Sequence, residues 1–167
     1  MNPSYFGDSY DLAKRFFCQE LALLGYTVSV DAMLTGDWNG TEQQFYQLIG
    51  ARPTEGQCAP SALFVDPDTG VHSSGSRKHI TYERMAELSL AHRLVFSFDQ
   101  SFSRQHVAKA VMERKLARLQ SLGCHAMYYD SHARFLFTAR QQEPIQELRS
   151  HLLLLGMPAS RLVAPST

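Results

Sequence analysis

Short apolar segments that end at an aspartate are the feature that most constrains how this chain folds. SALFV is followed by Asp66, LVFSF is followed by Asp99, and the alternating, β-branched segment TVSVD ends at Asp31. Apolar runs of this length, closed by turn-forming residues, are typical of strands buried in a parallel sheet. The sequence therefore predicts a sheet whose strands carry acidic side chains at their carboxyl ends.

Helix signals alternate with these strands. Residues 9–24 have apolar side chains at helical spacing, a capping residue at Asp8 or Ser9 and a stop at Gly25. Further helices are expected from three capping residues and one first-turn proline: Thr41, Thr81, Ser103 and Pro144. The segment CHAMYYDSHARFLFTA predicts a β-hairpin, and RLVA predicts a final edge strand.

This order of elements predicts an α/β fold, namely a three-layer, Rossmann-like, mostly parallel sheet with an antiparallel edge hairpin. Of the 167 residues, 44% are hydrophobic, and no low-complexity segment or long linker divides them. Residues 1–167 are therefore expected to form a single α/β domain.

Charge and composition limit how the chain can meet nucleic acid or a membrane. Sixteen Lys and Arg residues balance sixteen Asp and Glu residues, so no net charge draws the whole chain to nucleic acid or anionic lipid. No apolar run approaches the roughly 20 residues that span a bilayer, and the first residues lack a signal-peptide pattern. We expect a cytoplasmic protein with no membrane partner. The spacing of its cysteines and histidines predicts neither a disulfide framework nor a dedicated zinc site, and its oligomeric state is left open.

Ligands of open α/β sheets bind beyond the carboxyl ends of the strands, which makes the strand-end aspartates the candidate site. Asp66 and Asp68 flank Pro67 directly after the most apolar strand. Such carboxylates can bind ribose hydroxyls, exocyclic amines or a divalent cation, and each can equally act as a helix cap or turn residue. A functional pair predicts that replacing both with Asn leaves the free protein at least as stable, because crowded negative charge is relieved.

Basic residues offer two places for a phosphate group. The loop HSSGSRKH contains Arg77 and Lys78, although a solvated loop is the alternative interpretation. The helix that follows LVFSFD carries Arg104, Lys115 and Arg118 on one side. There they can face a nucleic-acid backbone, or cover apolar surface with their aliphatic stems. Nucleic acid therefore stays among the expected partners, beside a nucleotide-type small molecule.

Three segments resemble, in their order, motifs of compact Rossmann-fold methyltransferases that modify adenine N6 in large-subunit ribosomal RNA. FGD with the helix SYDLAKRFF is similar to the family's N-terminal GNxxDVLKH stretch. VDAMLTGDW stands at the place of its first strand and cofactor loop, and VDPDTG at the place of its DPPY motif. Here Asp68 and Thr69 replace the second proline and the aromatic residue of DPPY. FGDSYD and DPD-x-G are also similar to segments of uncharacterised bacterial and phage proteins, which implies no function.

The resemblance implies a methyltransferase-like domain that binds a nucleotide-type ligand such as S-adenosylmethionine, with or without activity. It gives Asp66 and Asp68 the catalytic positions, in which Asp66 accepts a hydrogen bond from the amino group that is methylated. The cofactor-binding residues are then Asp8, Asp31, Gly36 and Pro67.

A Mg²⁺-dependent nuclease or phosphohydrolase is the second hypothesis, and it explains the extra carboxylate in DPDTG. Arg77 and Lys78 would receive the substrate phosphate, while several carboxylates lie within about 5 Å of a shared ion. The metal ligands would be Asp66, Asp68 and Asp99, joined by Asp8. A non-catalytic interaction module is the third hypothesis, favoured if side chains fill the rim formed by the strand ends.

Overall fold

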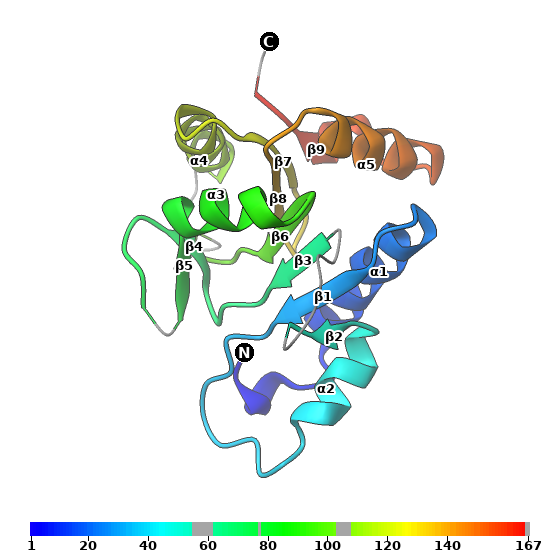
Figure 1. Cartoon of the computed structure of the whole chain (residues 1–167), viewed down its shortest axis with the longest axis vertical. Coiled ribbons are helices and arrows are strands. Elements are labelled where there is room, and N and C mark those ends of the chain that lie inside the picture. Colours follow the sequence, from blue (N-terminus) through cyan, green and yellow to red (C-terminus); the bar gives the residue numbers. More distant parts are fainter. Residues whose placement is uncertain (55–61, 77, 103–107, 166–167) are drawn as a thin grey trace.

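The computed structural model describes residues 1–54, 62–76, 78–102 and 108–165, and its main feature is one large β-sheet (Figure 1). Seven strands of the described chain form this sheet in the order β2-β1-β3-β6-β8-β7-β9. Their bounds are β1 (Val28–Asp31), β2 (Arg52–Pro53), β3 (Ala62–Val65), β6 (Leu94–Phe98), β7 (His125–Tyr129), β8 (Phe135–Ala139) and β9 (Leu162–Val163). Strands β2, β1, β3 and β6 run parallel, whereas β8 is antiparallel to β6, β7 to β8, and β9 to β7. The expected α/β sheet with an antiparallel hairpin is confirmed.

Helices cover both faces of the sheet and complete three layers. Helices α1 (Ser9–Leu23), α2 (Glu42–Ile49) and α5 (Glu143–Leu154) pack on one face, and α3 (Tyr82–Ala91) and α4 (Ala108–Ser121) pack on the other. Short 3₁₀ helices, η1 (Pro3–Tyr5) and η2 (Ala159–Arg161), precede α1 and β9. Within the described ranges, no helix is long and apolar enough to cross a membrane.

The alternation of side chains along the central strands divides the core into two apolar layers. Phe64 and Phe96 stack with ring centroids 4.9 Å apart in the layer that contacts α1, α2 and α5. Leu63 and Val95 belong to the layer that contacts α3 and α4. Because both faces are covered, β3 and β6 are apolar at successive positions rather than at every second one. Packing from both sides fixes where the carboxyl ends of these strands lie.

A second, two-stranded sheet lies beside the carboxyl ends of β3 and β6. It consists of β4 (Gly70–His72) and β5 (His79–Thr81), which pair in parallel. The surrounding sequence is polar and turn-forming, so it predicts only a loop there. Buried Val71 and Ile80 hold this small sheet against the layer that contains α3 and α4.

Most of the predicted helix boundaries are confirmed. Asp8 accepts two backbone N–H groups at the start of α1, and Thr81 accepts one at the start of α3. Gly50 ends α2 in the left-handed conformation, as its position predicts. Thr41 precedes α2 but does not cap it, because its hydroxyl donates to a carbonyl in the preceding turn instead. Ser103 lies outside the described residues.

Candidate functional site

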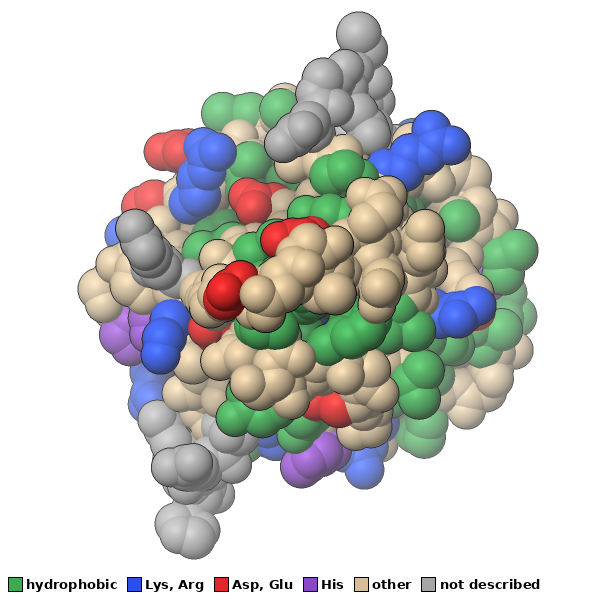
Figure 2. All heavy atoms as spheres, turned by 90° about the horizontal axis from the view of Figure 1, so that it is seen from below, with side chains coloured by type: hydrophobic (Ala, Val, Ile, Leu, Met, Phe, Trp, Pro, Cys, Tyr) green, Lys and Arg blue, Asp and Glu red, His purple; other side chains and the backbone are tan. Residues whose placement is uncertain are grey.

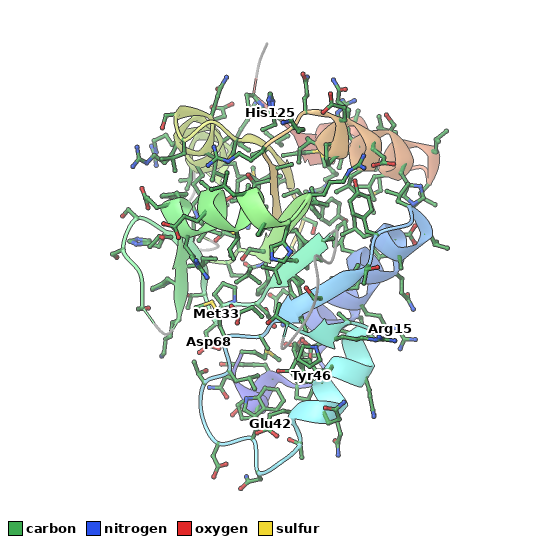
Figure 3. The ribbon with its side chains drawn as sticks, in the orientation of Figure 1. Arg15, Met33, Glu42, Tyr46, Asp68 and His125 are labelled. Atoms are coloured by element: carbon green, nitrogen blue, oxygen red, sulfur yellow. The ribbon has the colours of Figure 1, made fainter. Side chains whose placement is uncertain are left out.

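The crevice where ligands usually bind in such a sheet is occupied by the chain itself. The strand order changes direction between β1 and β3, and open α/β sheets bind ligands at that point. Here the backbone nitrogen of Met1 lies 3.2 Å from the Ala32 carbonyl oxygen, 3.0 Å from that of Met33 and 2.8 Å from Asp68 Oδ1. Figure 3 shows Met33 and Asp68 together at this edge. Any ligand site must therefore lie further along the edge.

An open cavity of about 1180 Å³ lies next to this crevice, along the carboxyl ends of β3, β6 and β7. The ends of β3 and β6 contribute Pro67 and Phe98. The N-terminal segment and the start of α1 form one side, β4 and β5 form another, and the β7–β8 loop lies beyond them. Apart from acidic residues, the lining is rich in aromatic and basic side chains: Tyr5, Tyr10, Phe98, Phe102, His72, His79, His132, Lys78, Arg134 and Arg161.

Lys14, on α1, is a buried cation between two carboxylates. Its Nζ atom lies 2.9 Å from Asp11 Oδ1 and 2.8 Å from Asp66 Oδ2, and 5.2 Å from the centroid of the Phe98 ring. None of Asp11, Lys14 and Asp66, which we call the Lys14 cluster, is more than 2% exposed. Asp66, the first residue after β3, is thus bound by a helix lysine at the wall of the cavity.

Two carboxylates share one ammonium group in the Lys14 cluster. Burial raises the pKa of Asp66, and the nearby charge of Lys14 opposes this only in part. Burial alone lowers the pKa of Lys14, but the charges of Asp66 and Asp11 outweigh it, so that pKa is raised. Lys14 is therefore charged at neutral pH. Asp66 Oδ1 is buried without a hydrogen-bond partner among the described residues.

Asp99, the first residue after β6, is the centre of a second buried cluster. Its Oδ2 atom accepts from Lys115 Nζ (2.6 Å) and from the Tyr128 hydroxyl (2.5 Å), and its Oδ1 atom accepts from the Ser101 hydroxyl (2.7 Å). Lys115 also donates to the Val71 carbonyl and to the Ser101 hydroxyl. With the bond to Asp99, these contacts use all three protons of the Lys115 ammonium group. An ammonium group with three acceptors is not a base for the serine. This Asp99 cluster joins β4, β6, β7 and α4 as a structural unit.

The residues predicted to bind a cofactor do not all reach the cavity. Asp8 and Pro67 line it, as does Asp66, whereas Asp31 and Gly36 do not. The Asp31 side chain accepts from the Met33 backbone at the exposed end of β1. Gly36 lies against Pro3 and has a φ of +75°. A Cβ at this position would be only 3.3 Å from Pro3 Cδ, which is a tight contact. Its close approach therefore serves the N-terminal segment, and the expected rim of Asp31, Gly36 and Asp66 does not form one site.

The carboxylates predicted to share a metal ion are held apart by separate partners. Asp66 is bound by Lys14, Asp99 by Lys115, and Asp68 by Thr35 Oγ1 at 2.6 Å as well as by the Met1 nitrogen. In the part of the chain that the structure describes, no three Asp, Glu, His or Cys side chains are placed to hold a metal ion. The expected ligand set of Asp66, Asp68 and Asp99 is thus not brought together, because Lys14, the Met1 nitrogen and Lys115 each bind one of these carboxylates instead.

The basic residues predicted to receive phosphate are placed in three ways. Lys78 lines the cavity, whereas Arg77 and Arg104 lie outside the described residues. Lys115 is only 6% exposed because it lies within the Asp99 cluster. The interpretation in which Lys115 faces a nucleic-acid backbone is therefore wrong. Arg118 is paired with Glu83 at 2.6 Å.

Several cavity residues were not found by sequence reasoning. Tyr10 and His132 come from α1 and the β7–β8 loop, and the Tyr10 hydroxyl lies 2.8 Å from His132 Nε2. Arg134, at the end of the β7–β8 loop, and Arg161, in η2, also line the cavity. No spacing in the sequence links these residues, because only the sheet order brings β7 and β9 to this edge. The hairpin sequence YYDSHAR was nevertheless a signal, since polar residues crowd its turn.

Replacing Asp8 with alanine is expected to lower the free energy of unfolding by about 1 kcal/mol, as for other helix caps. Its Oδ1 atom accepts from the backbone of Tyr10 at 2.8 Å and of Asp11 at 3.1 Å. Asp8→Asn keeps a capping oxygen and should restore most of the loss in urea unfolding. Equal losses in both variants would show that the charge, rather than the cap, is what stabilises the protein.

Comparisons with known proteins add no relative to this geometry. No protein-family model, no curated protein and no solved structure matches the chain. The function must therefore be inferred from the cavity and its lining.

Proposed function

We propose that this domain binds a nucleotide-type ligand in the cavity at the carboxyl ends of β3, β6 and β7. The observation that supports this most is the cavity itself, which is open, about 1180 Å³ in volume, and placed where α/β sheets bind ligands. The usual crevice between β1 and β3 is filled, so the ligand lies on the β6 side of Asp66.

Aromatic side chains on the α1 side of the cavity suit a base. Tyr5 is 63% exposed at its edge, and the rings of Tyr10 and His132 stack with centroids 5.4 Å apart. Gln100 donates to the His132 carbonyl and so fixes the loop that carries this ring. Flat π-faces of this kind stack on bases with little dependence on sequence.

Cationic side chains on the other sides suit a phosphate group. Lys78 and Arg161 form no ion pair with any described residue, and both line the cavity. Arg134 is held by Asp130 at 2.8 Å, which orients its guanidinium group. A ligand with an aromatic ring at one end and negative charge at the other is complementary to this arrangement.

S-adenosylmethionine is a less favoured ligand of the same class. Asp31 and Gly36 would hold it, but Asp31 contacts the backbone of Met33 and Gly36 contacts Pro3, and neither lines the cavity. Catalytic roles for Asp66 and Asp68 stay predictions. Because Lys14 binds one oxygen of Asp66, and Met1 and Thr35 bind the two oxygens of Asp68, we propose binding and no catalytic step.

Thermal unfolding with AMP, ATP, adenosine and S-adenosylmethionine tests the proposal. A ligand at 100 times its dissociation constant adds about 2.7 kcal/mol to the free energy of unfolding. We expect AMP or ATP to raise the melting temperature of the parent and of Ser150→Trp, which alters an exposed residue of α5. Ser131→Trp places a large ring at the cavity lining and should abolish the shift.

Two other results would decide against parts of this proposal. No shift with any of the four compounds contradicts nucleotide binding. A shift with S-adenosylmethionine alone contradicts the proposal that the cationic side of the cavity binds phosphate. It would favour the methyltransferase-like interpretation instead.

A further inference from the structure

Two histidines face each other at the β4–β5 side of the cavity. His72 ends β4 and His79 begins β5, and their ring centroids are 5.3 Å apart. Lys78 is next to them, and all three line the cavity. Figure 2 shows His side chains adjoining Lys and Arg at its left edge, the side on which Figure 1 places β4 and β5.

The hydrogen bonds of the two rings assign their tautomers. The backbone N–H of Ser74 donates to His72 Nδ1 at 3.2 Å, so the neutral His72 ring carries its proton on Nε2. The Thr69 hydroxyl donates to the Lys78 carbonyl at 2.8 Å, so His79 Nδ1, 2.5 Å from the same hydroxyl, must be the donor there. Neutral His79 therefore has a lone pair on Nε2. Neither Nε2 atom has a hydrogen-bond partner among the described residues.

The charges around this pair are mainly positive. Burial lowers the pKa of His79, and the nearby side chains of His72, Lys115 and Lys78 lower it further, whereas Asp99 raises it. The Asp99 carboxylate is already saturated by its own cluster. A smaller hollow next to the cavity shares His72 and adds Arg114, which has no ion pair with a described residue. Asp68, whose carboxylate Lys78 stabilises, is bound by Thr35 and Met1.

We propose that His72, Lys78 and His79 form a binding subsite for a phosphate group or similar tetrahedral oxyanion, and that binding places a proton on His79 Nε2. This deepens the proposed function, on which it rests, because it makes the ligand a phosphorylated one. The His72 tautomer set by Ser74 carries a proton on Nε2 that can be donated to the anion. His79 can donate to the anion only after it takes up a proton, whereas Lys78 contributes its permanent charge.

The affinity for an oxyanion therefore depends on pH in a defined way. In the free protein His79 titrates below its usual pKa, so it is neutral at pH 7 and gives the anion nothing. A bound anion raises that pKa. Between the two pKa values each unit of falling pH is expected to strengthen binding about tenfold, since one proton is taken up per anion.

Titration with sulfate is the appropriate test, because sulfate does not itself change charge in this range. We expect binding, followed by the His ring signals in NMR spectra, to tighten as the pH falls from about 7.5 to about 5.5, with a slope that approaches about tenfold per pH unit. His79→Gln should reduce the pH dependence, and His72→Gln should weaken binding at every pH. His125→Gln is the matched control, since His125 is exposed at the opposite end of the molecule (Figure 3).

The possible outcomes separate this inference from the proposed function. Sulfate binding that is independent of pH, or that survives unchanged in both histidine variants, overturns the inference. If AMP and adenosine bind equally well, and sulfate does not bind, nucleoside binding stands and the phosphate subsite fails. If sulfate binds as described but no nucleotide does, the subsite stands and the nucleotide proposal fails.

Discussion

Replacing Lys14 with methionine is expected to lower the free energy of unfolding by about 3–5 kcal/mol at neutral pH. Methionine fills a similar volume but leaves the carboxylates of Asp11 and Asp66 buried without their shared cation. Urea unfolding followed by circular dichroism measures the loss.

The control is the neighbouring residue of the same helix. Arg15 is exposed on α1, so Arg15→Met should change stability by less than about 0.5 kcal/mol. The loss in Lys14→Met should shrink as the pH falls. Without Lys14 the folded-state pKa of Asp66 rises further above its unfolded value, so the folded state binds the extra proton and gains stability on acidification. A loss as small as that of Arg15→Met would show that the ion pair is not what holds α1 to β3.

Replacing Gly70 with alanine is expected to cost about 2–5 kcal/mol, the sum of overpacking and backbone strain. Gly70 has φ of +116°, and a Cβ there would meet Asp99 Oδ1 and the Asp99 Cα, which is 2.7 Å away. Asp99 cannot move aside, because Lys115 and Tyr128 bind its other oxygen. Chemical unfolding of the purified variant gives the value.

Gly156→Ala separates the two contributions. Gly156 also has positive φ, +90°, but nothing lies within 4 Å of the position of its Cβ. Gly156→Ala should lower the free energy of unfolding only by the contribution of backbone strain, about 1 kcal/mol. If both variants lose the same amount, the contact between Gly70 and the Asp99 cluster has no energetic weight.

The sequence predicted the strands well because burial on both faces leaves an unmistakable apolar run, as in SALFV before Asp66. It also predicted correctly that acids stand at the strand ends. It could not predict their partners. Lys14 lies 52 residues before Asp66 and Lys115 lies 16 residues after Asp99, and only the packing of α1 and α4 on opposite faces brings each lysine to its acid.

The missing partners change what the DPDTG segment is expected to do. In the sequence alone, the two carboxylates are expected to repel each other, and replacing both with Asn is expected not to lower the stability of the protein. In the structure Asp66 is paired with Lys14 and Asp68 with the Met1 nitrogen, so Asp66→Asn removes a buried ion pair and is expected to destabilise the protein. The cavity side chains from the β7–β8 loop were missed for a similar reason, since their approach depends on the strand order.

The place of β8 in the sheet has a consequence for synthesis of the chain on the ribosome. Strand β8 lies between β6 and β7, although it is made after both. Until it emerges, β6 has no neighbour on that side, and all five of its residues belong to the buried core. Unpaired apolar edges of this kind favour aggregation. We therefore expect the nascent protein to be most prone to aggregation in the interval that ends when residues 135–139 leave the ribosome.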